Sequence, residues 1–170
     1  TGFPTRPILA MPANFIRDQP LDIEFLWESA TAATEYTLQI ASERAFADED
    51  ILFTFDAISD TSILVTDLDP DTFYYWRVKA SNDIGTGNWS DIWRLKTADA
   101  TTSVAENQPI PSEFRLFQNY PNPFNPTTTL AFSLPKSAKI SLRIFDRLGR
   151  EVATVVDDVL PQGRYDVPFN

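Results

Sequence analysis

The sequence contains no cysteine and no histidine among its 170 residues. The chain therefore lacks thiol redox chemistry, disulfides, zinc sites with cysteine or histidine ligands, and both the Ser-His-Asp and the Cys-His catalytic groups. Glycine is scarce as well, with 5 residues against 13 prolines. That balance favours short extended segments and turns over long helices. No apolar run is long enough to cross a membrane as a helix.

The residues that are present are those of a folded chain. Hydrophobic residues make up 43% and aromatic residues 13%, which is enough apolar material for one or two cores. The net charge of -10 repels phosphate, so we expect no nucleic-acid partner. The chain begins at Thr1 without Met or a signal peptide, and we expect it to be a fragment of a longer protein.

Charge divides the chain into two parts. Residues 1–98 carry 7 basic and 16 acidic side chains, whereas residues 99–170 carry 7 and 8. Between the parts, residues 99–112 are rich in Ala, Thr, Ser and Pro without an apolar period, which is typical of a linker. The sequence thus predicts a first domain at 1–98, a linker at 99–112 and a second domain at 113–170.

Apolar side chains recur at every second position in both domains, which is the pattern of half-buried strands. In the first domain, about seven short strands predict a β-sandwich, with 42–50 as the only candidate helical turn. In the second, turns at 135–137, 147–149 and 161–163 have spacings suited to hairpins between antiparallel strands. The clearest strands lie at 21–27, 36–40, 51–55, 63–65, 74–80, 93–95, 130–134, 140–144, 152–156 and 165–169. The predicted fold class is all-β, with two sandwich domains.

The segment 68–82, with the sequence LDPDTFYYWRVKASN, resembles the E-to-F corner and F strand of fibronectin type III domains. The resemblance covers about residues 4–98 and implies an immunoglobulin-like sandwich. It also implies four structural roles: Leu68 fills the core, Pro70 stiffens the corner, the Tyr74 hydroxyl bonds a backbone group near Leu68, and Trp27 supplies a buried indole.

Three aromatic residues of the first domain are candidate binding residues. Phe73 and Tyr75 alternate with the inward-facing set, and Trp89 lies in the loop after this strand. They offer a stacking platform for a sugar ring or a partner protein. The alternative is that they pack against a neighbouring domain or loop.

Metal, cofactor and catalytic sites are not expected. Asp67, Asp69 and Asp71 alternate like calcium ligands, but Thr72 and Val78 stand where a calcium loop needs Gly and Glu. The acidic residues lie mainly at turns and outward strand positions, with no apolar pocket to raise a carboxyl pKa for proton donation. We therefore predict no metal, no cofactor and no catalytic residue.

An Asn- and Pro-rich string opens the second domain. Its prolines fix φ angles and favour extended geometry before them, while its asparagines can cap turns. We expect a rigid, kinked entry in which Tyr120 and Phe124 pin the string to the sheet. The residues are Asn119, Tyr120, Pro121, Asn122, Pro123, Phe124, Asn125 and Pro126.

This string resembles the opening motif of the type A C-terminal sorting domains of the type IX secretion system of Bacteroidetes. The similarity continues through 130–135, 140–146 and 148–152, including the hairpin-motif residues Asp146, Gly149 and Arg150. The resemblance implies a small antiparallel sandwich that directs a passenger from the periplasm through the outer-membrane translocon. It also implies frequent removal of the tail as the passenger is linked to surface lipopolysaccharide. The motif residues have two alternative roles, structural or in direct contact with the translocon.

Members of that family usually continue beyond the segment that matches 163–170 with a further pair of strands. We therefore expect the second domain to be truncated at Asn170. An incomplete sandwich would leave an open strand edge, where the chain would fray or pair with another chain.

Together these patterns predict the noncatalytic C-terminal region of a secreted or surface-attached bacterial protein, exported via the periplasm. The first domain is a spacer, and the second binds the type IX machinery. Two alternatives remain. The chain could be an adhesion or assembly module that binds polysaccharide, a neighbouring subunit or itself, or it could be an accessory region of an upstream secreted hydrolase.

Overall fold

The computed structural model describes residues 2–99 and 111–170 of the chain. Apart from one short 3-10 helix, η1 (Asp48–Asp50), the regular elements in these ranges are strands, which confirms the all-β prediction. No helix of the described residues is long and apolar enough to span a membrane. The described residues form two compact units, unit 1 with residues 2–14 and 18–99, and unit 2 with residues 15–17 and 111–170.

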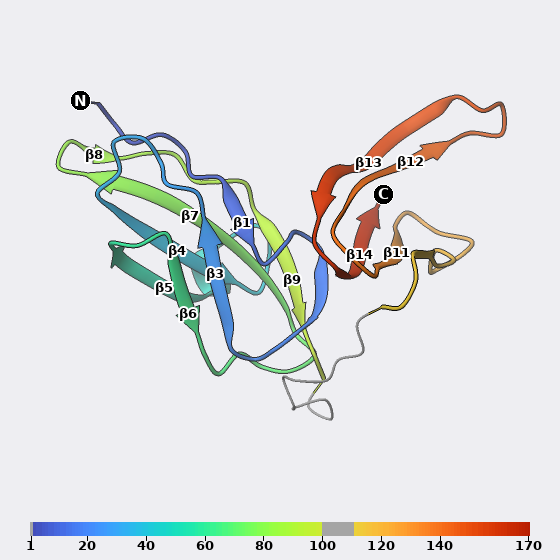
Figure 1. Cartoon of the computed structure of the whole chain (residues 1–170), viewed down its shortest axis with the longest axis horizontal. Coiled ribbons are helices and arrows are strands. Elements are labelled where there is room, and N and C mark those ends of the chain that lie inside the picture. The colour runs from blue at the N-terminus through green and yellow to red at the C-terminus, as the bar shows by residue number, and fades with distance from the viewer. Residues whose placement is uncertain (1, 100–110) are drawn as a thin grey trace. The chain divides into compact units, whose positions relative to one another are not determined.

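Unit 1 is a sandwich of two antiparallel sheets (Figure 1). One sheet has the order β1-β3-β6, and the other contains the order β9-β7-β4-β5 with β8 beside β7. The strands are β1 (Leu9–Met11), β3 (Ile23–Trp27), β4 (Glu35–Ala41), β5 (Ile51–Ile58), β6 (Ser62–Val65), β7 (Phe73–Asn82), β8 (Gly85–Thr86) and β9 (Trp93–Thr97). The short β1 lies outside the segments that the alternation predicted.

The core of unit 1 lies between the two sheets and is rich in aromatic rings. Phe25 of β3 meets Trp76 of β7 edge to face at 5.0 Å, and Trp27 meets Tyr36 of β4 at 5.5 Å. Because side chains alternate across a strand, β7 buries every second residue from Tyr74 to Ala80. The period-2 pattern thus places one face of the strand in the core.

The corner before β7 is closed by Tyr74, whose hydroxyl accepts a hydrogen bond of 2.8 Å from the Asp69 N–H. Burial raises the pKa of this hydroxyl. Leu68 and Trp27 are buried in the core, whereas Pro70 is exposed at the corner. A backbone N–H that would otherwise lack a strand partner is satisfied here by a side chain.

Unit 2 contains the strands β10 (Arg115–Leu116), β11 (Thr128–Leu134), β12 (Ala138–Phe145), β13 (Glu151–Leu160) and β14 (Gly163–Phe169). Strand β11 pairs with β14 along its length and with β10 on its other side. Strands β12 and β13 form a separate long hairpin (Figure 1). Tyr165 is fully buried and stacks on Phe132 at 5.1 Å, and its hydroxyl donates to the Pro161 carbonyl at 2.8 Å. Burial raises the Tyr165 pKa well above its ordinary value.

The expected chain of hairpins in unit 2 is wrong in two of its three turns. The turn at 147–149 joins β12 to its neighbour β13, but the turns at 135–137 and 161–163 join strands that are not paired. A short turn can carry the chain either to the adjacent strand or across to another sheet, so turn spacing alone does not fix the pairing.

The last strand has partners on both sides, which corrects part of the expectation of an open edge. Besides β11, residues 15–17 lie beside β14: Tyr165 is opposite Ile16, and the Asp166 N–H donates to the Phe15 carbonyl at 3.1 Å. Arg17 forms an ion pair of 3.2 Å with Asp166. Ile16 begins β2 (Ile16–Gln19), a strand whose partner lies too far along the chain for local patterns to predict. Residues 100–110, most of the expected linker, lie outside the described residues.

Candidate functional site

The Asn- and Pro-rich segment 119–126 is held to unit 2 by hydrogen bonds at its start. The Asn119 amide donates to the Thr128 hydroxyl at 3.0 Å, and this hydroxyl donates to the Pro121 carbonyl at 2.9 Å. Tyr120 and Thr129 exchange two backbone hydrogen bonds of 3.2 and 2.9 Å. Thr128 is only 4% exposed, so the anchor is buried while residues 121–127 are exposed.

The two rings of this segment behave differently from one another. Phe124 packs edge to face on Phe169 of β14 at 6.3 Å. Tyr120, which was expected to pin the segment, has 81% of its surface exposed. The ring therefore does not pin the segment, because the contact with Thr129 is made by the Tyr120 backbone.

The hairpin turn between β12 and β13 is organised by one carboxylate. One oxygen of Asp146 accepts the N–H groups of Leu148 and Arg150 at 2.8 and 3.0 Å, and the other accepts the Arg150 Nε at 2.7 Å. The Arg150 and Leu148 hydrogen bonds hold the Asp146 pKa below its ordinary value. Gly149 has φ +77°, which a residue with a side chain rarely adopts.

Among the described residues, no hydrogen bond, ion pair or ring contact joins this turn to segment 119–126. The two motifs are therefore separate surfaces. Asn119, Asp146, Gly149 and Arg150 have structural roles through their side chains or backbone conformation, whereas the ring of Tyr120 has none.

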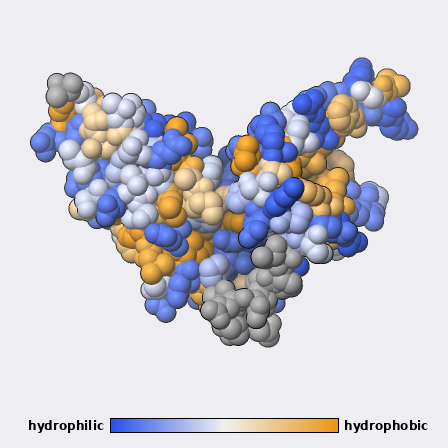
Figure 2. Space-filling view, viewed as in Figure 1, coloured by the Kyte–Doolittle hydropathy of each residue, from blue (hydrophilic) through white to orange (hydrophobic). Residues whose placement is uncertain are grey.

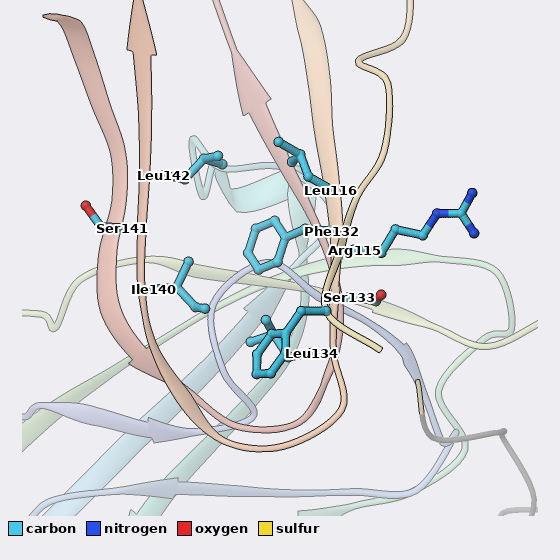
Figure 3. Close-up of a pocket in the computed structure, with 9 residues that line it drawn as sticks. Arg115, Leu116, Phe132, Ser133, Leu134, Ile140, Ser141 and Leu142 are labelled. Atoms are coloured by element: carbon cyan, nitrogen blue, oxygen red, sulfur yellow. The ribbon is translucent and has the colours of Figure 1, made fainter. Parts of the chain in front are cut away.

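A groove of about 230 Å³ lies between β11 and the β12–β13 hairpin (Figure 3). Ile140 and Leu142 of β12 point across it toward Phe132 and Leu134, while Arg115 points away. The other lining residues are Phe114, Leu116, Ser133 and Ser141. Six of the nine lining residues are apolar and three, Arg115, Ser133 and Ser141, are polar, so the groove is mainly an apolar surface. Figure 2 shows hydrophobic residues among hydrophilic ones on the molecular surface.

Two of the three candidate aromatics of unit 1, Trp89 and Phe73, are covered by cations that sequence reasoning overlooked. The Arg77 guanidinium lies 4.1 Å from the centroid of the Trp89 ring and 4.1 Å from that of Phe46. The Phe73 ring is covered by the cations of Arg94 and Lys96 at 4.6 and 5.2 Å.

The alternation of residues 73–79 contained a signal for this arrangement. If Tyr74, Trp76 and Val78 face inward, then Tyr75, Arg77 and Lys79 must share the outward face. The register adds Arg94 opposite Tyr75 and Lys96 opposite Phe73. Trp89 and Phe46 lie in loops, so only the tertiary structure could place them on this face.

In the described part of the chain, no three Asp or Glu side chains gather closely enough to hold a metal ion. The acids at 67, 69 and 71 serve the corner instead. The Asp67 N–H donates to the Asp22 carboxylate at 3.1 Å. Asp71 pairs with Lys96 at 2.6 Å.

Comparison with known proteins gives a family for the first part of the chain. The model of the fibronectin type III domain matches residues 12–94. Similar solved structures include the FN5 domain of Drosophila Lar, which is 24% identical with a TM-score of 0.43 and covers 57% of this chain and 99% of that one. They also include an Fn3-like protein from Clostridium thermocellum, which is 18% identical with a TM-score of 0.42 and covers 58% and 94%. No curated protein matches the chain.

Fibronectin type III domains are typically noncatalytic modules that act as spacers or binding surfaces. The family match, the two-sheet sandwich and the Tyr74 corner agree with one another. Residues 12–94 are therefore a fibronectin type III domain.

Proposed function

We propose that the chain is the noncatalytic C-terminal region of a secreted or surface-attached bacterial protein that is exported via the periplasm. In this proposal, residues 113–170 direct export through the outer-membrane translocon of the type IX system. The fibronectin type III domain separates this signal from the passenger. Surface lipopolysaccharide becomes the second partner when the tail is removed and the passenger is attached.

The observation that carries the proposal is the presentation of segment 119–126. A recognition signal must be exposed, yet it binds best when its shape is fixed before binding, because less conformational entropy is then lost. The buried Thr128 hydroxyl and the Tyr120–Thr129 backbone pair hold the segment. The Tyr120 ring, 81% exposed, is left without a structural role inside unit 2.

Tyr120 is therefore the residue that we assign to translocon contact. Aromatic rings supply large contact area for little loss of conformational freedom, and exposed aromatics often mark binding sites. Asn119 acts instead by holding the segment, and Asp146, Gly149 and Arg150 act by shaping the hairpin turn.

An export assay tests the proposal. A signal peptide and a fluorescent protein are fused ahead of the chain, with every residue that the gene encodes after Asn170 retained. The fusion is expressed in a bacterium with a type IX system and in a translocon-deficient strain. We expect fluorescence at the surface or in the medium of the first strain only.

Two variants separate recognition from folding. Tyr120→Ala should retain the fusion in the periplasm with unit 2 folded, whereas Phe145→Ala, at another exposed aromatic of the same unit, should be exported normally. Periplasmic retention of the folded parent fusion would reject the export function, and normal export of Tyr120→Ala would reject the role of Tyr120.

A second candidate function is adhesion, and one observation favours it. The outward face of the fibronectin type III domain concentrates basic and aromatic side chains. Adhesion and export are compatible, because a sorted protein can also carry a binding module. An accessory role beside an upstream hydrolase would use the same face.

A further inference from the structure

One face of unit 1 collects basic side chains in a domain that is otherwise acidic. Residues 1–98 contain only 7 basic residues against 16 acidic ones. Arg77, Lys79, Arg94 and Lys96 are four of the seven, and all lie on the outward face of β7 and β9. With the rings of Phe46, Phe73, Tyr75 and Trp89 they form what we call the basic-aromatic face.

Arg77 lies at the centre of this face and is held from three sides. Its guanidinium is stacked between Phe46 and Trp89, and its Nε and one Nη donate to the Gln39 side-chain oxygen at 3.1 and 2.7 Å. Burial lowers the Arg77 pKa, but an arginine stays charged at physiological pH. The face therefore keeps a fixed, partly dehydrated positive charge.

Lys79 extends the positive charge along β7. Its ammonium lies 4.9 Å from the centroid of the Trp89 ring. Among the described residues no carboxylate forms an ion pair with Arg77 or Lys79. These two charges are thus compensated by rings and an amide, which stabilise a cation without neutralising it.

Acidic residues border the face on two sides. Asp71 pairs with Lys96, and Asp56 accepts a hydrogen bond of 2.7 Å from Thr37, which lies opposite Lys79 in the sheet. The chain as a whole is strongly acidic, but at physiological salt charges further away than about 8 Å are largely screened. A ligand close to the face therefore meets mainly the charges of the face itself, where Asp71 offsets the charge of Lys96.

The rings between the cations add apolar surface. Phe73 is 40% exposed, and Tyr75 and Trp89 are half-buried. Residues two apart on a strand are separated by about 7 Å, so cations and rings lie within a short distance of one another on this sheet face. Such a surface offers a carboxylate partner and an apolar contact at neighbouring points.

We propose that the basic-aromatic face binds an acidic polysaccharide whose sugars carry carboxylates. The carboxylates would pair with Arg77 and Lys79, and the C–H faces of the sugars would pack on Phe73, Tyr75 and Trp89. An acidic peptide fits less well, because extended peptides gain affinity from the open edge of a sheet and this is a sheet face. This proposal goes beyond the export function and gives the spacer domain a ligand.

The test is a titration of the purified full chain with polygalacturonate, followed by calorimetry and by amide NMR signals of β7 and β9. We expect binding that weakens as salt rises from 0.05 to about 0.5 M, because ion pairs at a surface are screened. The double variant Lys79→Gln/Lys96→Gln should lower the affinity by about fivefold or more. Lys136→Gln, at an exposed lysine of unit 2, removes one charge that is not part of the face and should leave binding unchanged.

Two further polymers and one further measurement decide the ligand class. Dextran tests for a neutral glycan and poly-glutamate for an acidic peptide. Sedimentation of the chain alone tests for a second copy on this face. The proposal is overturned if polygalacturonate does not bind, if the double variant binds as the parent does, or if poly-glutamate binds equally well. It is also overturned if the chain associates with itself and the double variant abolishes that association.

The test requires that the double variant is folded, and its amide NMR spectrum shows whether it is. Phe73→Leu gives a second readout that leaves every charge in place, and it should weaken binding without changing the salt dependence. The titration uses no secretion machinery, so its failure leaves the export proposal intact, and failure of the export assay leaves this proposal intact.

Discussion

Units 1 and 2 show a similar alternation of apolar and polar residues, but their apolar side chains are buried to different extents. On β7 of unit 1, the inward residues Tyr74, Trp76, Val78 and Ala80 are at most 1% exposed. On β12 of unit 2, the corresponding positions from Ala138 to Ile144 are only half-buried. Alternation therefore predicts which face of a strand is apolar, whereas the depth of burial depends on the layer that covers that face.

The difference follows from how each strand is covered. In unit 1 a second sheet faces β7, and ring contacts such as that of Phe25 with Trp76 cross the core. In unit 2 the hairpin has two strands only, and it leaves Phe145 and Leu148 near its tip 55% and 79% exposed. A hairpin alone is marginally stable in water, so unit 2 depends more on turn hydrogen bonds and on its small core around Tyr165.

The largest effect is expected for Leu38→Ala in unit 1. Leu38 is fully buried on β4, so the substitution removes apolar contacts and leaves a cavity, at a cost of about 2–5 kcal/mol in the free energy of unfolding. Native-state hydrogen exchange of the β4 and β7 amides measures this cost within the full chain. A cost below about 1 kcal/mol would contradict the tight core described for unit 1.

A smaller effect is expected for the same change in unit 2, Leu142→Ala. Leu142 lines the open groove and is half-buried, so about 1 kcal/mol is lost because part of its surface is already in water. Exchange of the β12 and β13 amides reports this value in the same experiment. Equal costs at positions 38 and 142 would show that the groove is closed in solution.

The smallest effect concerns the turn of the hairpin and depends on pH. Because hydrogen bonds lower the Asp146 pKa in the folded chain, the stabilisation is present above the pKa of the unfolded chain and is lost as pH falls through the folded pKa. Carbon NMR titration of the Asp146 carboxyl should give a midpoint below that of an unstructured aspartate. Asp146→Asn should remove this part of the acid sensitivity of β12–β13 amide exchange, and an unchanged acid profile would contradict the role of the carboxylate.

Several elements were predictable because their causes are local. Residues 74–80 alternate so regularly that strand β7 and its outward set follow from the sequence, and the turns at 135–137, 147–149 and 161–163 are marked by Gly, Pro and Ser. The strands β1, β2, β8 and β10 were missed, since two to four residues give too short a pattern to recognise. The cations of the basic-aromatic face were visible in the alternation, but their partners Phe46 and Trp89 lie in loops.

The all-β class, most of the strands and the fibronectin type III signature of residues 68–82 followed from local patterns, because backbone alternation and turn chemistry act between near neighbours. The absence of cysteine and histidine excluded their chemistry outright. Three features came from the folded structure alone: residues 15–17 pair with β14, β12–β13 forms a separate hairpin, and the Tyr120 ring is exposed. These features depend on contacts between residues far apart in the chain, for which a local pattern contains no information.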